Sequence, residues 1–388
     1  MARGLEDVTA LFESYHALSN LTAIRHGLKA HLYTGKVTDD LQAKEAAMMR
    51  GVDRNPLAYT YEPGGFYDVL KARVKAHFLG CHTRTPPASP LPWEEAPKAA
   101  APPLTPGESV TITRYVKATP AWYAKMAALL AVYIPLYLAM LGVDVLGRGA
   151  GLGVGARLAA AFAAGALLQC ISFCALHDAS HYALWRRAGA AQEALSRCCN
   201  AWTLWNHAMW MLHHVYGHHS FTGDPTRDPD LIHARPFIRK SLLSPLHEYF
   251  RWFVDWQHVV APGFMCVIPG QSLGQTISYA RGAAQGHVWR VPARDVRGGI
   301  RWYEWCVYAL SVGSHLWGMN IFVSYAYLMG INTLYHLTIA PDHDTYESAV
   351  LNARHPKPSA PQDWGEAQVR NGHGRSRAKS GIQIHASM

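Results

Sequence analysis

Leu158–His181 reads LAAAFAAGALLQCISFCALHDASH, and this stretch decides the fold. From Leu158 to Leu176 the run carries no charge, and only Gln169 interrupts its apolar character. A helix needs about 20 predominantly apolar residues to cross the hydrocarbon of a bilayer. The stretch therefore predicts a membrane-spanning helix whose end carries two histidines, His177 and His181.

Two further apolar runs support a membrane protein. Met126–Val143 is uncharged, and Val307–Ile331 is apolar but contains His315 and Asn320. After the second histidine cluster, a return of the chain to its starting side needs two crossings of about 20 residues each. Trp302–Asn332 supplies only 31 residues, and Phe253–Gly270 could contribute but contains Asp255 and His258, so we expect a shortened membrane unit. A soluble domain with buried helices is the alternative, although core helices are usually shorter and polar on one side.

The charge pattern gives the expected orientation. The chain of 388 residues has a formal net charge of +9. Basic residues precede the first run and follow the second, for example Lys117, Lys125, Arg186 and Arg197. Cytoplasmic loops carry such an excess of Lys and Arg, so both histidine clusters should lie in the cytosol. The surplus thus favours a membrane face over a nucleic-acid partner. We expect an all-α, polytopic helical membrane protein with a cytosolic histidine-bearing helical cap, placed in the endoplasmic reticulum.

A second histidine cluster, HVYGHH, starts at His214. On an α-helix, residues four apart share a face. His177 and His181 can therefore point into one space, and so can His214 and His218. His219 is turned by about 100° from His218 and could reach a second metal ion. Neutral imidazole suits Zn, Cu, Fe and Ni, so the spacing does not name the metal. Surface or hydrogen-bonded core histidines are the alternative.

Other polar residues near these clusters have two interpretations each. Asp178, Asp228 and Asp230 could orient ligand imidazoles through hydrogen bonds. Asx turns before proline explain the same DPTRDPD segment without a function. Asn332 and His336, four residues apart at the end of the third run, form a candidate ligand pair. Taken in isolation, this pair is better explained by a capping Asn and an interfacial His.

Composition divides the chain into four regions. Residues 1–84 read as a soluble region that includes an amphipathic helix over Phe66–Phe78, at a membrane interface or on a protein surface. Residues 85–109 are a Pro-rich linker without a core of its own. The membrane domain covers 110–371, and 372–388 is a basic, disordered tail.

Taken together, these motifs resemble the membrane-bound fatty acid desaturase superfamily, most closely its front-end acyl-lipid members. HDASH resembles the first histidine box of that family. HVYGHHSFTG, followed by DPTRDPD, resembles the second box and its tail. HDTYES and the later DWGEAQVRN resemble the segment that leads to the third box. The resemblance extends from about Phe66 to Asn371.

The resemblance implies a fatty acid desaturase that uses two iron ions and O2 to introduce a double bond into a long acyl chain. The implied ligands are His177, His181, His214, His218, His219 and His336, with Asn332 acting through water. The implied substrate is an acyl-lipid or acyl-CoA, and the implied electron donors are cytochrome b5 and its reductase. Hydroxylation by the same centre is an alternative outcome. A non-catalytic membrane protein with an incomplete metal site is the alternative from another class.

The chain departs from the family pattern near both ends. After Asn371 no QxxHH box follows, and the remaining candidates are His343, His355 and His373. We therefore expect a truncated domain, through an incomplete gene or a real loss of activity. Val8–His16 resembles the end of a fused cytochrome b5-like domain. The His-Pro-Gly-Gly strand of that domain is absent, and Glu62–Gly65 imitates it in the wrong order, so we expect no haem.

Overall fold

The computed structural model describes residues 59–62, 64–80, 117–143, 152–186, 189–224, 228–232, 238–239, 246–260, 263, 281, 287–288, 291–292, 300–318, 320–338 and 362–371. These residues are mostly helical, as expected. Two short strand pairs accompany the helices: β1 (Tyr59–Thr60) with β4 (Gln362–Asp363), and β2 (His287–Val288) with β3 (Val291–Pro292). Several expectations lie outside the described residues, namely those for Val8–His16, the linker 85–109, the tail 372–388, His343, His355 and His373.

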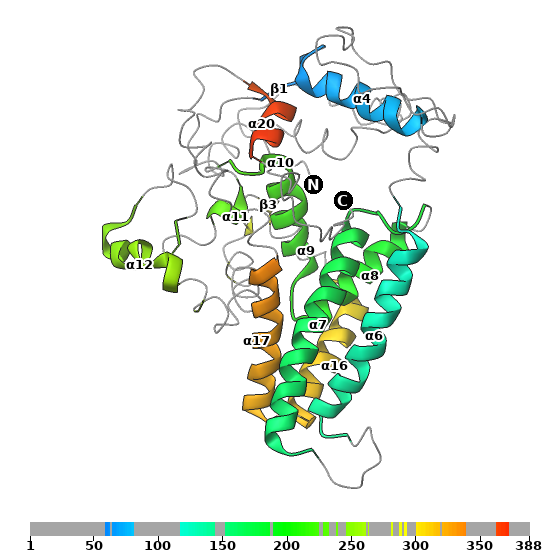
Figure 1. Ribbon diagram of the computed structural model, residues 1–388, viewed down its shortest axis with the longest axis vertical. Coiled ribbons are helices and arrows are strands. Elements are labelled where there is room, and N and C mark those ends of the chain that lie inside the picture. The colour runs from blue at the N-terminus through cyan, green and yellow to red at the C-terminus, as the bar shows by residue number, and fades with distance from the viewer. Residues whose placement is uncertain are drawn as a thin grey trace, which may run out of the picture.

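A bundle of helices forms the lower half of the molecule (Figure 1). Its members are α6 (Pro120–Met140), α7 (Val154–Ser180), α8 (Gly189–Trp202), α16 (Trp302–Gly318) and α17 (Ile321–Thr338). Two of them, α6 and α7, are long and apolar enough to cross a membrane, with mean hydropathies of 1.5 and 1.9. These two helices contain the first two apolar runs of the sequence. Their side chains and those of α17 build the main hydrophobic core.

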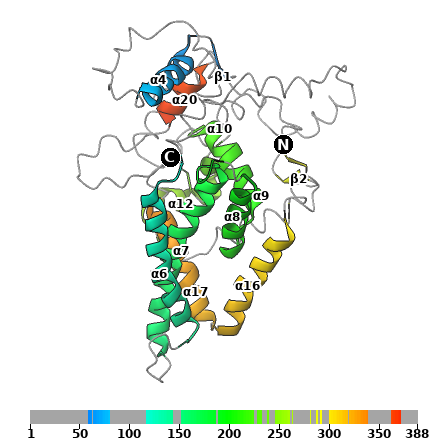
Figure 2. The ribbon, with the colours of Figure 1, turned by 90° about the vertical axis from the view of Figure 1, so that its right-hand side faces the viewer.

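The third apolar run is divided between two helices, in agreement with the need for two crossings. It forms two helices, α16 and α17, which diverge from a sharp bend (Figure 2). Asn320 explains the start of α17, because its side-chain oxygen accepts the backbone N–H of Val323 at 2.9 Å. Asn is among the preferred residues at a helix N-terminus. The 17 residues of α16 and the 18 of α17 thus lead down the bundle and back to the cap.

Helices α7 and α17 cross at two glycines. A Cβ atom on Gly165 would lie 2.0 Å from the carbonyl oxygen of Tyr327, and one on Gly330 would lie 2.1 Å from that of Phe162. Small residues at a crossing let two membrane helices approach closely. This close approach fixes α17 beside α7, the helix that carries His177.

Short elements form the cap above the bundle. They are α4 (Phe66–Gly80), α9 (His207–Trp210), the π-helix η2 (Met211–His218), α10 (His219–Phe221), α11 (Pro229–Ile232), η3 (Glu248–Phe250), α12 (Arg251–Asp255) and α20 (Trp364–Asn371). Asp363 accepts the backbone N–H of Tyr67 at 3.1 Å, and Trp364 donates from Nε1 to the carbonyl oxygen of Ser220 at 2.9 Å. The amphipathic helix expected over Phe66–Phe78 is present as α4, and it packs against α20 through Tyr67. The first and last described segments therefore meet beside the second histidine cluster.

Candidate metal centre

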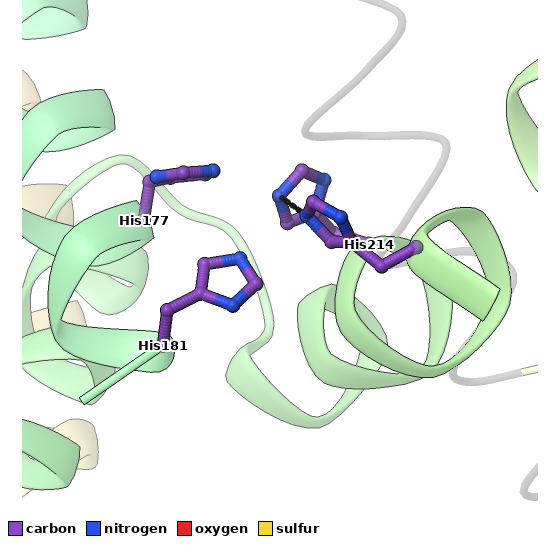
Figure 3. A group of neighbouring side chains, drawn as sticks. His177, His181 and His214 are labelled. Carbon is purple, nitrogen blue, oxygen red and sulfur yellow. Dashed lines mark hydrogen bonds between the residues drawn. The ribbon is translucent and has the colours of Figure 1, made fainter. Parts of the chain in front are cut away.

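The first histidine pair lies where α7 leaves the apolar bundle. His177 is on the last turn of α7, and the backbone N–H of His181 donates to the carbonyl oxygen of His177 at 3.1 Å. Their ring centroids are 4.7 Å apart. Both rings project from α7 toward His214 (Figure 3). The α-helical spacing of four thus brings this pair together, as the sequence indicates.

The second cluster does not follow the α-helical expectation. Met211–His218 is a π-helix, and the backbone N–H of His219 donates to the carbonyl oxygen of His214. This winding brings residues five apart onto one side, and π-helical turns occur frequently at functional sites. The Nε2 atoms of His214 and His219 lie 3.0 Å apart. The rings of His214 and His218 also stack, with centroids 5.7 Å apart, and the ring of His219 lies closer to His214, at 4.5 Å.

Four imidazoles now share one space. Nitrogen atoms of His177, His181, His214 and His219 all lie within 4.8 Å of one another. Because metal–imidazole bonds are about 2.0–2.1 Å long, two nitrogens on adjacent positions of one ion are roughly 3 Å apart. The distance between His214 and His219 meets this requirement. Nε2 of His181 is buried and has no hydrogen-bond partner among the described residues, as suits a ligand position. The group therefore fits a metal ion.

Burial also keeps these rings in the form that binds metal. Burial first, and then His219 and the other neighbouring histidines, hold the pKa of His214 well below its usual range. Burial, with a smaller contribution from His177, lowers the pKa of His181 to about 3. Only neutral imidazole has a lone pair for a metal ion. At neutral pH the two rings are therefore ready to act as ligands.

His218, at the end of the π-helix, contacts two carboxylates. Its Nδ1 is 3.0 Å from Oδ1 of Asp228 and 3.2 Å from Oδ2 of Asp230. Asp228 is buried, and it also accepts the backbone N–H groups of Gly223 and Asp230. The turn interpretation and the orienting interpretation of Asp228 are thus compatible. A carboxylate on Nδ1 fixes the tautomer of the ring and directs Nε2 away from the carboxylate.

Asp178 has the matching position beside the first pair. Its Oδ1 is 3.0 Å from Nδ1 of His177, and its Oδ2 accepts the indole N–H of Trp122 at 2.9 Å. Trp122 lies on α6, so a neighbouring helix positions the Asp178 carboxylate, which in turn contacts His177. Each histidine cluster therefore has an aspartate that contacts Nδ1 of one of its rings.

Asn332 and His336 lie near the cap end of α17. Nδ1 of His336 is 2.8 Å from the backbone carbonyl oxygen of Asn332, and Asn332 is buried. Among the described residues, the imidazole of His336 belongs neither to the four-histidine group nor to the group of His218, Asp228 and Asp230. The structure therefore brings four of the predicted histidine ligands into one group, places His218 in a second, and leaves His336 outside both.

Sequence reasoning missed three side chains at the centre. Trp122 supports Asp178, as described. The ring of Trp210 stacks on His214 with centroids 4.3 Å apart, and Nε2 of His213 lies 2.5 Å from Oδ1 of Asp230. The doubled His213–His214 was a visible signal for the last of these. No local pattern marked Trp122, because Asp178 lies on another helix, whereas Trp210 stands four residues before His214.

Comparison with known families supports this description. A model of the fatty acid desaturase family matches residues 152–377, which is more than half of the 388 residues. Searches of curated proteins and of solved structures return no match. The matched region begins just before α7, includes both groups of candidate ligands and ends just after α20. The chain therefore belongs to the fatty acid desaturase family.

Proposed function

We propose that this chain is an iron-dependent desaturase that introduces a double bond into a long-chain acyl group, in unsaturated fatty acid biosynthesis. The proposal rests on one observation above all. Four imidazoles lie within 4.8 Å of one another at the point where an apolar helix bundle ends. The resemblance to front-end acyl-lipid desaturases and the basic residues around α6 and α7 support a multi-pass protein of the endoplasmic reticulum, with this centre in the cytosol.

The residues of the chain bind and orient in this proposal. His177, His181, His214 and His219 would hold one iron ion, and His218 would contribute Nε2 to a second. His336, with Asn332 acting through water, completes the proposed set. When bound, the two ions supply the redox chemistry that an unactivated methylene C–H requires, since side-chain acids and bases cannot oxidise it.

Two aspartates act through the ligands. Asp178 would hold the ring of His177 with Nδ1 toward the carboxylate, and Asp228 would do the same for His218. Hydrogen bonds of this kind raise the basicity of the ligand and fix its direction. Asp230 contacts both His213 and His218, and would therefore help to orient the ring of His218.

The electron balance of the reaction requires an electron donor besides the acyl substrate. Reduction of O2 to two molecules of water takes four electrons and four protons. Removal of two hydrogens from the acyl chain supplies two of each, so a separate donor supplies the other two electrons. We propose cytochrome b5 and its reductase as this donor, and an acyl-lipid or acyl-CoA as substrate. Residues 110–371 would form the catalytic domain, after the soluble region 1–84 and the linker 85–109.

Expression in a membrane host tests the proposal. The full chain and its His214→Ala variant are supplied with long polyunsaturated acids, and fatty acid methyl esters are analysed together with the iron content of the purified protein. A new double bond that depends on His214 supports the proposal. A product that gains oxygen identifies a hydroxylase instead. Stoichiometric iron without any modified lipid contradicts both enzymatic functions.

A further inference from the structure

The helical segment 248–260 exposes one aromatic face. Tyr249, Trp252, Trp256 and Val259 have exposed fractions of 90%, 66%, 52% and 60%. Their spacings of three, four and three place them on roughly one side of a segment that passes from the 3-10 helix η3 into α12 and through a turn at Trp256. Large aromatic side chains in such a group are normally covered by something, since exposed apolar patches mark interaction sites. These four side chains are therefore a candidate interaction surface, which we call the aromatic face.

The charged residues of the same segment lie on the neighbouring face. Arg251 approaches Glu248 at 3.3 Å and Asp255 at 3.8 Å, and the side chains of all three are more than half exposed. One basic residue thus stands against two acidic ones. The segment is amphipathic but carries no basic surplus, so attraction to an anionic surface does not explain it.

Hydrogen bonds fix how the segment is rotated. The side-chain amide of Gln257 accepts the backbone N–H of Arg239 at 2.8 Å and donates to its carbonyl oxygen at 3.1 Å. These two bonds tie Gln257 to the protein. Its position on the helix is roughly 100° from the centre of the aromatic face, at 100° per residue. The aromatic face is therefore directed away from this attachment.

The height of the segment agrees with a bilayer boundary. In Figure 1, α12 lies to the left of the helix bundle, at the height of the upper end of α17, where the bundle meets the cap. Figure 2 shows α16 beginning at the same end of the bundle. The exposed fractions of Trp302 and Trp305, on the first turn of α16, are 77% and 60%. Tryptophan and tyrosine are enriched at membrane–water interfaces. The aromatic face of the segment thus continues a belt that the bundle itself exposes.

We propose that the face formed by Tyr249, Trp252, Trp256 and Val259 docks in the headgroup region of the bilayer and holds the histidine-bearing cap against the membrane. The proposal rests on the membrane placement of the proposed desaturase. Because the segment has no basic surplus, docking depends on the aromatic rings and takes place on a zwitterionic surface. Most amphipathic helices of this kind instead carry Lys and Arg on the polar face.

Photo-crosslinking of the full chain in phosphatidylcholine nanodiscs tests this contact. The photoreactive residue p-benzoylphenylalanine replaces Trp256 in one variant, Trp252 in a second, and Asp255 in a matched control. All three positions are exposed, so the substitutions leave packing intact, and gel filtration checks the fold. Lipid adducts are quantified by mass spectrometry of the digested protein.

The expected result is a several-fold excess of lipid adducts at 252 and 256 over 255, unchanged when phosphatidylserine replaces part of the phosphatidylcholine. Equal lipid labelling at all three positions overturns the proposal, and so does crosslinking at 256 to a second copy of the chain. Adducts that require phosphatidylserine also contradict it. The readout needs neither iron nor turnover, so an inactive chain that still labels lipid at 256 separates this inference from the proposed reaction.

Discussion

The two histidine clusters share one spacing but not one geometry. His177 and His181 stand four apart on an α-helix, and their rings meet. His214 and His218 also stand four apart and their rings stack, but on this π-helix Nε2 of His214 lies 3.0 Å from that of His219, and Nδ1 of His218 bonds to Asp228. Spacing thus predicts which histidines share a side only when the winding of the backbone is known.

Replacing each of the two adjacent histidines of the second cluster by alanine should have the largest effect on metal binding. We expect His219→Ala to abolish metal binding by the four-histidine group, because it removes one of four ligands. His218→Ala should leave one metal ion per chain on that group. Metal content of purified protein, after loading with a single equivalent of Fe(II) or Co(II), checks the difference. Equal losses in the two variants would restore the α-helical pairing.

The carboxylate beside His218 should have the next largest effect. Asp228→Asn keeps the shape of the side chain but removes its charge, and we expect metal affinity or activity to fall by roughly 10–100-fold. Titration of the second equivalent of metal measures this loss. Asp255→Asn, at an exposed position, is the matched control and should change nothing. A variant with unaltered binding would leave only the turn interpretation of Asp228.

The packing of α7, which carries the first cluster, against α17 can be tested at the helix crossing beside Gly165. Gly165→Ala would place a Cβ atom 2.0 Å from the carbonyl oxygen of Tyr327, so α7 and α17 must separate. Overpacking of this kind costs about 1–3 kcal/mol. Thermal unfolding in detergent, followed by circular dichroism, measures the change. Gly155→Ala on the same helix meets nothing within 4 Å, and it should be neutral or stabilising. Equal stability of both variants would contradict the close crossing.

The support of the first cluster from α6 should have the smallest effect. Trp122→Phe retains an aromatic ring but removes the hydrogen bond to Asp178, a loss of about 1 kcal/mol. We expect a few-fold weaker metal binding together with an unfolding temperature that is lower by a few degrees. Trp305→Phe, at an exposed position of α16, serves as the control. A drop in stability without any change in metal binding would assign Trp122 to packing alone.

Local sequence was sufficient for much of the fold. The apolar runs at Met126–Val143 and Leu158–Leu176 predict α6 and α7 because length and composition alone decide whether a helix can be buried in hydrocarbon. The point at which the third run divides into α16 and α17 was not predicted. Its signal, Asn320, is a single capping residue within an otherwise apolar stretch, and a capping side chain acts only through the geometry of its own turn.

The amino-acid sequence alone was enough to predict the class of this protein: an apolar helix bundle, histidines at one of its ends, and the desaturase family. Only the tertiary structure decided which histidine meets which. A Cβ atom on Gly217 would lie 2.5 Å from Pro229, so the turn that carries Asp228 packs closely on the π-helix and brings this carboxylate to His218. Such a contact joins residues that are distant along the chain, and no spacing rule within one segment encodes it.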